Sequence, residues 1–178
     1  MAAGGARQDP WKRAFATVVP DADFFRADQL ALYRRMVAAP RYRRLFARYF
    51  ASLERGGRPG EGVLVHCGAG KDRTGFLCAL TQRLLGLGDA EVFDDYLAAN
   101  DEPGLEARIR AFQGMIASLG ARPVDEAALR AALLVEPAYL QAAFSEISAG
   151  WGSLEAYFTL GLGIGEAGQD RIRQALLD

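Results

Sequence analysis

The residues best suited to chemistry lie in one short stretch, VLVHCGAGKDRTG, which spans residues 63–75. It holds the only histidine of the chain, His66, followed directly by Cys67, and Arg73 comes six residues after the cysteine. A cysteine thiolate is a strong nucleophile, and a guanidinium group can bind two oxygens of a phosphate at once. The spacing therefore indicates a loop that binds a phosphate and attacks its phosphorus atom.

Two apolar runs flank this loop. VLVH (63–66) is short and β-branched and predicts a buried strand, whereas the run from Thr74 predicts a buried helix that ends near Gly86–Gly88. Successive backbone N–H groups between them, and the positive end of the helix, would point to one place. We expect this cradle to bind phosphate and to favour the thiolate. Its predicted members are Gly68, Ala69, Gly70, Lys71, Asp72, Arg73 and Thr74.

The side chains of this stretch predict a division of roles. Cys67 would attack phosphorus and form a phosphocysteine intermediate that water hydrolyses, with Arg73 on the phosphoryl oxygens. His66 is expected to pack behind the loop and tune the cysteine. The Thr74 hydroxyl would bond to the thiolate or help to release it.

The reaction also needs a general acid that protonates the leaving oxygen. Asp72 is the favoured candidate because it already lies in the loop. Asp21 and Asp23, which precede the first predicted helix, remain open as alternatives.

The string HCGAGKDRTG resembles the loop HCxAGKDRTG of a bacterial subgroup of cysteine-dependent tyrosine and phosphoinositide phosphatases. The resemblance implies a dual-specificity-phosphatase-like α/β fold and hydrolysis of phosphate monoesters without a metal or another cofactor. It also implies that Cys67 is the nucleophile and Arg73 the phosphate ligand. In that subgroup the loop lysine and aspartate, here Lys71 and Asp72, are associated with acceptance of phosphoinositides as well as phosphotyrosine. Weaker similarity runs from about Asp21 to the end, in LYRRMV (32–37), DDYLAAN (94–100), EPAYL (136–140) and GSLEAYFTLGLG (152–163).

The chain departs from the family before the loop. Members carry an N-terminal portion with an NFRDLG-like motif and several strands of the sheet, and the sequence before residue 63 has no such motif. Only AFATVV (14–19) could add a strand. We therefore expect a single, N-terminally truncated domain over 1–178, mostly helical, with a reduced parallel sheet around strand 63–66. A miscalled start codon and a chain that completes its sheet by oligomerising are the alternatives, because unpaired buried amides are costly.

Periodicity and capping residues predict helices for most of the remaining chain. Pro40 is well placed to begin one of them. Asp89, Asp125 and Ser153 are the predicted caps of three others. The predicted helices span 27–39, 40–53, 90–99, 103–119, 126–134, 137–149, 154–161 and 166–177.

Several other patterns have simpler interpretations. A Walker-type nucleotide loop is excluded, because Val65 and Asp72 stand where it needs a glycine and a serine or threonine. The GxGxxG match at 163–168 is followed by too few residues for a βαβ unit. Cys78 lies in the apolar helix and is expected in the core. A run of arginines without acids between them is either a solvated face or a basic rim for anionic lipid or acidic phosphopeptide: Arg34, Arg35, Arg41, Arg43, Arg44 and Arg48.

Composition limits the location and the partners. A net charge of −1 gives no reason to expect nucleic-acid binding. Two cysteines, no signal-like apolar segment at the N-terminus and no apolar stretch long enough to span a bilayer favour the cytoplasm. The predicted partner is a phosphorylated protein or a phosphoinositide. An inactive phosphate-binding remnant stays open, as does a rhodanese-like sulfurtransferase, against which the HC…GKDRTG context argues.

Overall fold

The computed structural model describes residues 20–55, 62–101, 104–118 and 124–177. The chain forms two compact units. The smaller unit combines Met1–Gln29 with Glu102–Leu134, and the larger unit combines Leu30–Asp101 with Val135–Asp178. The single domain expected over 1–178 stays a prediction.

The smaller unit holds a compact core of its own. Its helices are the first part of α2 (Ala22–Ala38), α6 (Leu105–Ser118) and α7 (Glu126–Leu133). Phe25, Ile109 and Leu129 are buried together in this core. The cap predicted at Asp125 is confirmed, because its carboxylate accepts a hydrogen bond from the backbone N–H of Ala128 at 2.7 Å. A capping carboxylate satisfies one of the helix N–H groups that otherwise lacks a partner.

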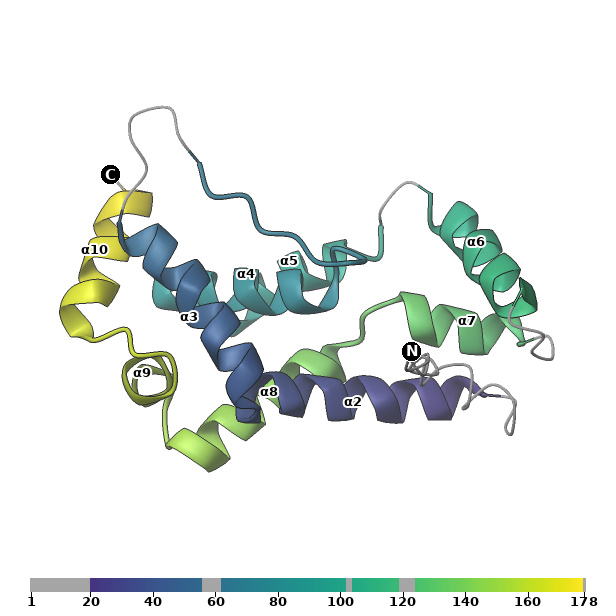
Figure 1. Ribbon diagram of the computed structural model, residues 1–178, viewed down its shortest axis with the longest axis horizontal. Helices are drawn as coiled ribbons and strands as arrows, with labels where there is room; N and C mark the ends of the chain where they lie inside the picture. Colours follow the sequence, from purple (N-terminus) through teal and green to yellow (C-terminus); the bar gives the residue numbers. More distant parts are fainter. Residues whose placement is uncertain (1–19, 56–61, 102–103, 119–123, 178) are drawn as a thin grey trace, which may run out of the picture. The chain divides into compact units, whose positions relative to one another are not determined.

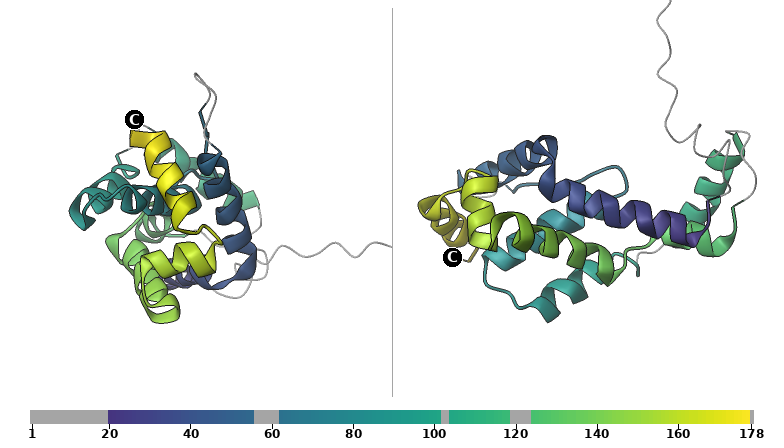
Figure 2. Two further views of the ribbon diagram at one scale, coloured as in Figure 1. Left: turned by 90° about the vertical axis from the view of Figure 1, so that its left-hand side faces the viewer. Right: turned by 90° about the horizontal axis from the view of Figure 1, so that it is seen from below.

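The larger unit carries the predicted phosphate loop and a larger core. Its helices besides the end of α2 are α3 (Pro40–Glu54), α4 (Asp72–Leu84), α5 (Asp89–Ala98), α8 (Pro137–Trp151), α9 (Leu154–Ala156), the π-helix η1 (Tyr157–Gly161) and α10 (Glu166–Leu177). Proline begins α3 and α8 as predicted, and the Ser153 side chain caps α9. Figure 2 shows α10 beside α3, and α4 packs on α5.

Aromatic side chains join the helices of the larger unit. Phe46 of α3 contacts the ring of Phe76 of α4, with centroids 5.5 Å apart, and Phe50 contacts Phe158 at 5.0 Å. All four side chains are fully buried. Burial of one such side chain contributes about 1.5–3 kcal/mol, so this cluster holds α4, and with it the loop, in place.

Some helix boundaries differ from the predicted ones because of caps. Helix α2 begins at Ala22, five residues early, since the Asp21 carboxylate accepts the backbone N–H of Phe24 at 2.8 Å. The cap of α5 is Gly88 rather than Asp89, because the Glu91 carboxylate accepts the Gly88 N–H at 2.8 Å.

The buried strand predicted at 63–66 is wrong for the described part of the chain. Residues 62–67 run as an irregular extended segment that leads into the loop before α4 (Figure 1). Leu64 is 87% exposed and Val63 is 43% exposed. A strand needs a neighbouring strand for its backbone groups, and none of the described residues supplies one. The reduced parallel sheet is therefore not confirmed, and AFATVV (14–19) lies outside the described residues.

Candidate active site

The loop that follows the extended segment turns sharply into α4. Gly70 has φ +72°, a conformation that favours glycine, and it lets the chain reverse before the helix. The backbone N–H of Gly75 then donates to the carbonyl of Lys71 at 2.8 Å and closes the first turn of α4. The helix thus begins at Asp72, two residues before the predicted Thr74, with its N-terminus at the loop.

The Cys67 side chain lies among hydrogen-bond donors of this loop. Burial by itself raises the pKa of the Cys67 thiol, but donors to the sulfur outweigh this effect and the pKa lies below its ordinary value. The donors are the Thr74 hydroxyl and the backbone N–H groups of Thr74, Gly70 and Ala69. The loop therefore stabilises a thiolate.

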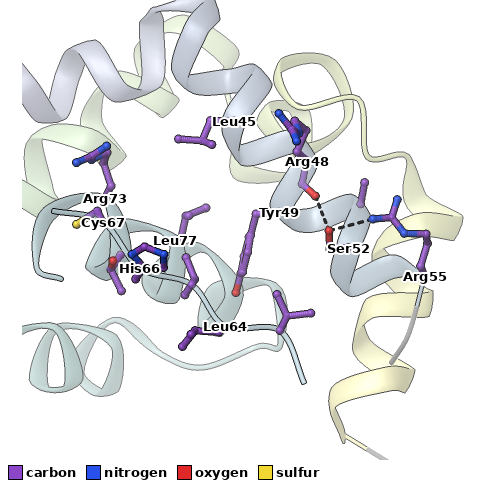
Figure 3. A pocket seen from close by; sticks show the side chains of 14 residues that line it. Leu45, Arg48, Tyr49, Ser52, Arg55, Leu64, His66, Cys67, Arg73 and Leu77 are labelled. Atoms are coloured by element: carbon purple, nitrogen blue, oxygen red, sulfur yellow. Dashed lines mark hydrogen bonds between the residues drawn. The ribbon is translucent and has the colours of Figure 1, made fainter. Parts of the chain in front are cut away.

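Arg73 lies over the same loop. Its guanidinium is so near to Gly68 that a Cβ atom on this glycine would be 3.7 Å from a terminal nitrogen of Arg73. Figure 3 shows the side chains of Arg73 and Cys67 next to each other. Arg73 is exposed, so its fork of N–H groups is available to an anion in front of the sulfur.

Lys71 and Asp72 face each other instead of solvent. Only 6% of Lys71 is exposed, and its ammonium nitrogen lies 3.2 Å from Oδ1 of Asp72. The Asp72 side chain is 15% exposed. Both residues were predicted to bind phosphate, and in this arrangement Lys71 makes an ion pair within the protein.

Two tyrosines extend this pair into the core. The hydroxyl of Tyr33 on α2 donates to Oδ1 of Asp72 over 3.4 Å, and the hydroxyl of Tyr96 on α5 donates to that of Tyr33 at 2.7 Å. Burial raises the pKa of both tyrosines above the ordinary value, so both stay protonated. A carboxylate, a lysine and two phenols thus form one network at the start of α4.

A groove of about 530 Å³ opens beside the loop. One wall is the extended segment, which contributes Val63, Leu64 and Val65. Another wall is α3 with Leu45, Arg48 and Tyr49, and Arg55 follows directly after the end of this helix (Figure 3). Arg55 donates to the hydroxyl of Ser52 at 3.0 Å, which keeps this arginine at the rim. Cys67 and Arg73 also line this groove, on the side away from Arg55 (Figure 3).

The structure does not bring the other predicted residues to the sulfur. His66 is exposed in the groove and makes no hydrogen bond with the described residues, so it does not pack behind the loop. Asp21 caps α2, and Asp23, whose side chain is 91% exposed, pairs with Arg26. Cys78 is half-buried in α4, and burial, followed by the charge of Asp95, raises its thiol pKa.

No group of three or more histidine, cysteine or acidic residues in the described ranges is arranged to hold a metal ion. Within the same ranges, no helix has the length and apolarity needed to cross a membrane.

Tyr33 and Tyr96 were missed by sequence reasoning. Their spacing marks them as core residues, and the one available signal is that a buried phenol needs a hydrogen-bond partner. Their partners are 63 and 39 residues away along the chain, so periodicity cannot identify them.

The chain is similar to known proteins over most of its length. A family model with the description "Tyrosine phosphatase family" matches residues 11–178. The triple specificity protein phosphatase PtpB of Mycobacterium tuberculosis is 40% identical over 127 residues, which are 68% of this chain and 45% of that protein. A protein of Cupriavidus necator, provisionally named a tyrosine-protein phosphatase, is 33% identical over 117 residues, or 66% of this chain and 40% of that one. The chain thus spans less than half the length of either relative. With a family match that covers nearly all of its length, the chain belongs to the tyrosine phosphatase family.

Proposed function

We propose that this chain hydrolyses phosphate monoesters through a phosphocysteine intermediate, and that phosphotyrosine is its main substrate. The observation that carries the proposal is the environment of the Cys67 sulfur, where a hydroxyl and three backbone N–H groups lower the thiol pKa. The same N–H groups, the helix N-terminus and Arg73 are suited to the oxygens of a phosphate. The names of both relatives support phosphatase activity.

The proposed reaction has two balanced steps. The Cys67 thiolate forms an S–P bond while the P–O bond to the leaving oxygen breaks, and a general acid gives this oxygen a proton. Water then attacks phosphorus and gives a proton back to the same group. The S–P bond breaks, inorganic phosphate leaves, and the thiolate is restored. Arg73 and the backbone N–H groups stabilise the charge of both transition states.

We assign the general acid to Asp72. Oδ1 of Asp72 accepts from Lys71 and Tyr33, and Oδ2 has no hydrogen-bond partner among the described residues. One oxygen is thus anchored and the other remains for a proton. The cap formed by Asp21 and the ion pair of the exposed Asp23 argue against these two alternatives.

The test is hydrolysis of an aryl phosphate by purified protein and by Cys67→Ser. We expect metal-independent turnover that vanadate blocks and that falls by at least about a thousandfold in the variant, since the nucleophile is lost. Cys78→Ser is the matched control and should keep the wild-type rate, because Cys78 lies within α4 away from the loop donors.

Two results would change the proposal. Equal turnover by wild type and Cys67→Ser would refute the phosphocysteine mechanism. A wild-type chain that binds vanadate without turnover would be a phosphate-binding remnant instead. Phosphoserine, phosphothreonine and phosphoinositide substrates, compared at one concentration with a phosphotyrosine peptide, then rank the substrate classes.

A further inference from the structure

A line of polar groups runs from the start of α4 into the core of the larger unit. Tyr96 donates to Tyr33 at 2.7 Å, so the single proton of the Tyr33 hydroxyl is free to point at another acceptor. That acceptor is Oδ1 of Asp72, 3.4 Å away. The distance is long for such a bond, as is common in active sites without substrate, where these contacts tighten on binding.

Packing alone does not require a hydroxyl at this position. The Tyr33 side chain is fully buried and its ring lies against those of Tyr96 and Tyr139. A phenylalanine would fill the same space without the cost of burying a hydroxyl. Tyr157, also fully buried in this core, offers a contrast, since its hydroxyl has no hydrogen-bond partner among the described residues. The hydroxyl of Tyr33, unlike that of Tyr157, is directed at a carboxylate of the phosphate loop.

The geometry at Asp72 gives this contact a consequence. The Lys71 ammonium and the Tyr33 hydroxyl both bind Oδ1, from two different elements of the fold. Two donors on one oxygen limit rotation of the carboxyl group. The position of Oδ2 is then set by the same two donors, and proton transfer depends steeply on such positions.

We propose that Tyr33 is a positioning residue of the reaction, which acts by holding Oδ1 of Asp72 so that Oδ2 delivers the proton to the leaving oxygen. Tyr96 orients the Tyr33 hydroxyl. The inference rests on the proposed function of the loop. Both tyrosines are buried, so they act on the reaction through Asp72 and do not touch the substrate.

The test is Tyr33→Phe in the full chain, with kcat/KM measured for a series of aryl phosphates of decreasing leaving-group ability. A good leaving group needs no proton, whereas a poor one does. We expect kcat/KM to fall about tenfold for phenyl phosphate and to change less than about twofold for a dinitrophenyl phosphate. Asp72→Asn should show the same pattern with a loss of about a hundredfold for phenyl phosphate.

A double variant and a matched control separate positioning from a general loss of structure. In the Asp72→Asn background, Tyr33→Phe should have no further effect, because the two residues act through one oxygen. Tyr157→Phe removes a buried hydroxyl that has no hydrogen-bond partner in the described part of the chain, and it should leave the leaving-group dependence unchanged. A uniform loss for all substrates in Tyr33→Phe would overturn the inference.

Tyr96→Phe provides a second variant, because it leaves Tyr33 and its packing intact. It should shift the leaving-group dependence in the same direction by a smaller factor, about threefold for phenyl phosphate. A leaving-group dependence equal to that of the wild type in Tyr96→Phe would show that Tyr96 does not orient the Tyr33 hydroxyl for the reaction. If the wild type shows no turnover, the proposed function is refuted. If Asp72→Asn keeps the wild-type leaving-group dependence, only the roles of Asp72 as general acid and of Tyr33 as positioning residue are refuted.

Discussion

At the scale of single residues, the two cysteines of the chain provide an internal comparison. Both are half-buried, and both lose solvation for that reason. The pKa of Cys67 nevertheless lies below the ordinary value because hydroxyl and backbone donors face its sulfur, whereas the pKa of Cys78 is raised by burial and by Asp95. The loop, rather than exposure, favours the thiolate form of one of the two cysteines.

Alkylation tests this difference without substrate. At neutral pH iodoacetamide should modify Cys67 faster than Cys78, since only the thiolate reacts and a lowered pKa keeps the thiolate populated as the pH falls. Mass spectrometry of the digested protein measures both rates over a pH series. Thr74→Ala should move the Cys67 profile to higher pH. A Cys67 profile at or above that of Cys78 would contradict the donor arrangement.

At the scale of elements, the contact of α4 with α5 depends on the glycine that follows Thr74. A Cβ atom on Gly75 would lie 3.0 and 3.2 Å from two ring atoms of Tyr96. The absence of a side chain lets the two helices approach, and it lets the Tyr96 hydroxyl reach Tyr33. Glycine therefore suits the last position of the RTG string because a side chain there would meet Tyr96 on another helix.

Gly75→Ala should lower the free energy of unfolding by about 1–3 kcal/mol, because the added methyl group displaces the Tyr96 ring. Thermal or urea denaturation measures the change. Gly114→Ala within α6 is the matched control, since a Cβ atom there meets nothing within 4 Å. It should raise stability by about 0.5–1 kcal/mol through helix propensity. Equal effects of the two substitutions would show that the ring contact does not matter.

At the scale of the whole molecule, the extended segment at 62–67 is a part of the larger unit that lies outside any helix or strand. Its backbone has no strand beside it in the described ranges, and Leu64 is 87% exposed. An extended apolar segment with unpaired backbone groups is a template for pairing with another chain. The earlier expectation that an oligomer completes the sheet remains a prediction on these grounds.

Leu64→Lys tests this expectation. The substitution should change the free energy of unfolding by no more than about 0.5 kcal/mol, because the leucine side chain makes few contacts in this chain. It should reduce concentration-dependent self-association, measured by light scattering, since a charge at an edge discourages pairing. Unchanged association would show that this segment is not the contact, and a large loss of stability would show that Leu64 is buried in solution.

The helices of this fold are determined largely by local sequence. Prolines at positions 40 and 137 begin α3 and α8, and Asp125 and Ser153 cap the helices that follow them. Two boundaries were predicted wrongly because a nearby cap was overlooked, at Asp21 and at Gly88. Capping acts over three or four residues, so the information is in the sequence.

The loop that leads into α4 is also determined by local sequence. Gly70 permits the turn, and the N–H groups that face Cys67 come from residues within seven positions of it. Only the tertiary structure decided how the loop and the segment before it meet the rest of the unit. These features are the contact of Tyr33 with Asp72, the close approach of Gly75 to Tyr96, and the exposure of Leu64. Each depends on segments far apart in the chain that meet, or fail to meet, in space. The sequence by itself therefore determined which reactive side chains share one loop, and packing decided what holds these side chains in position.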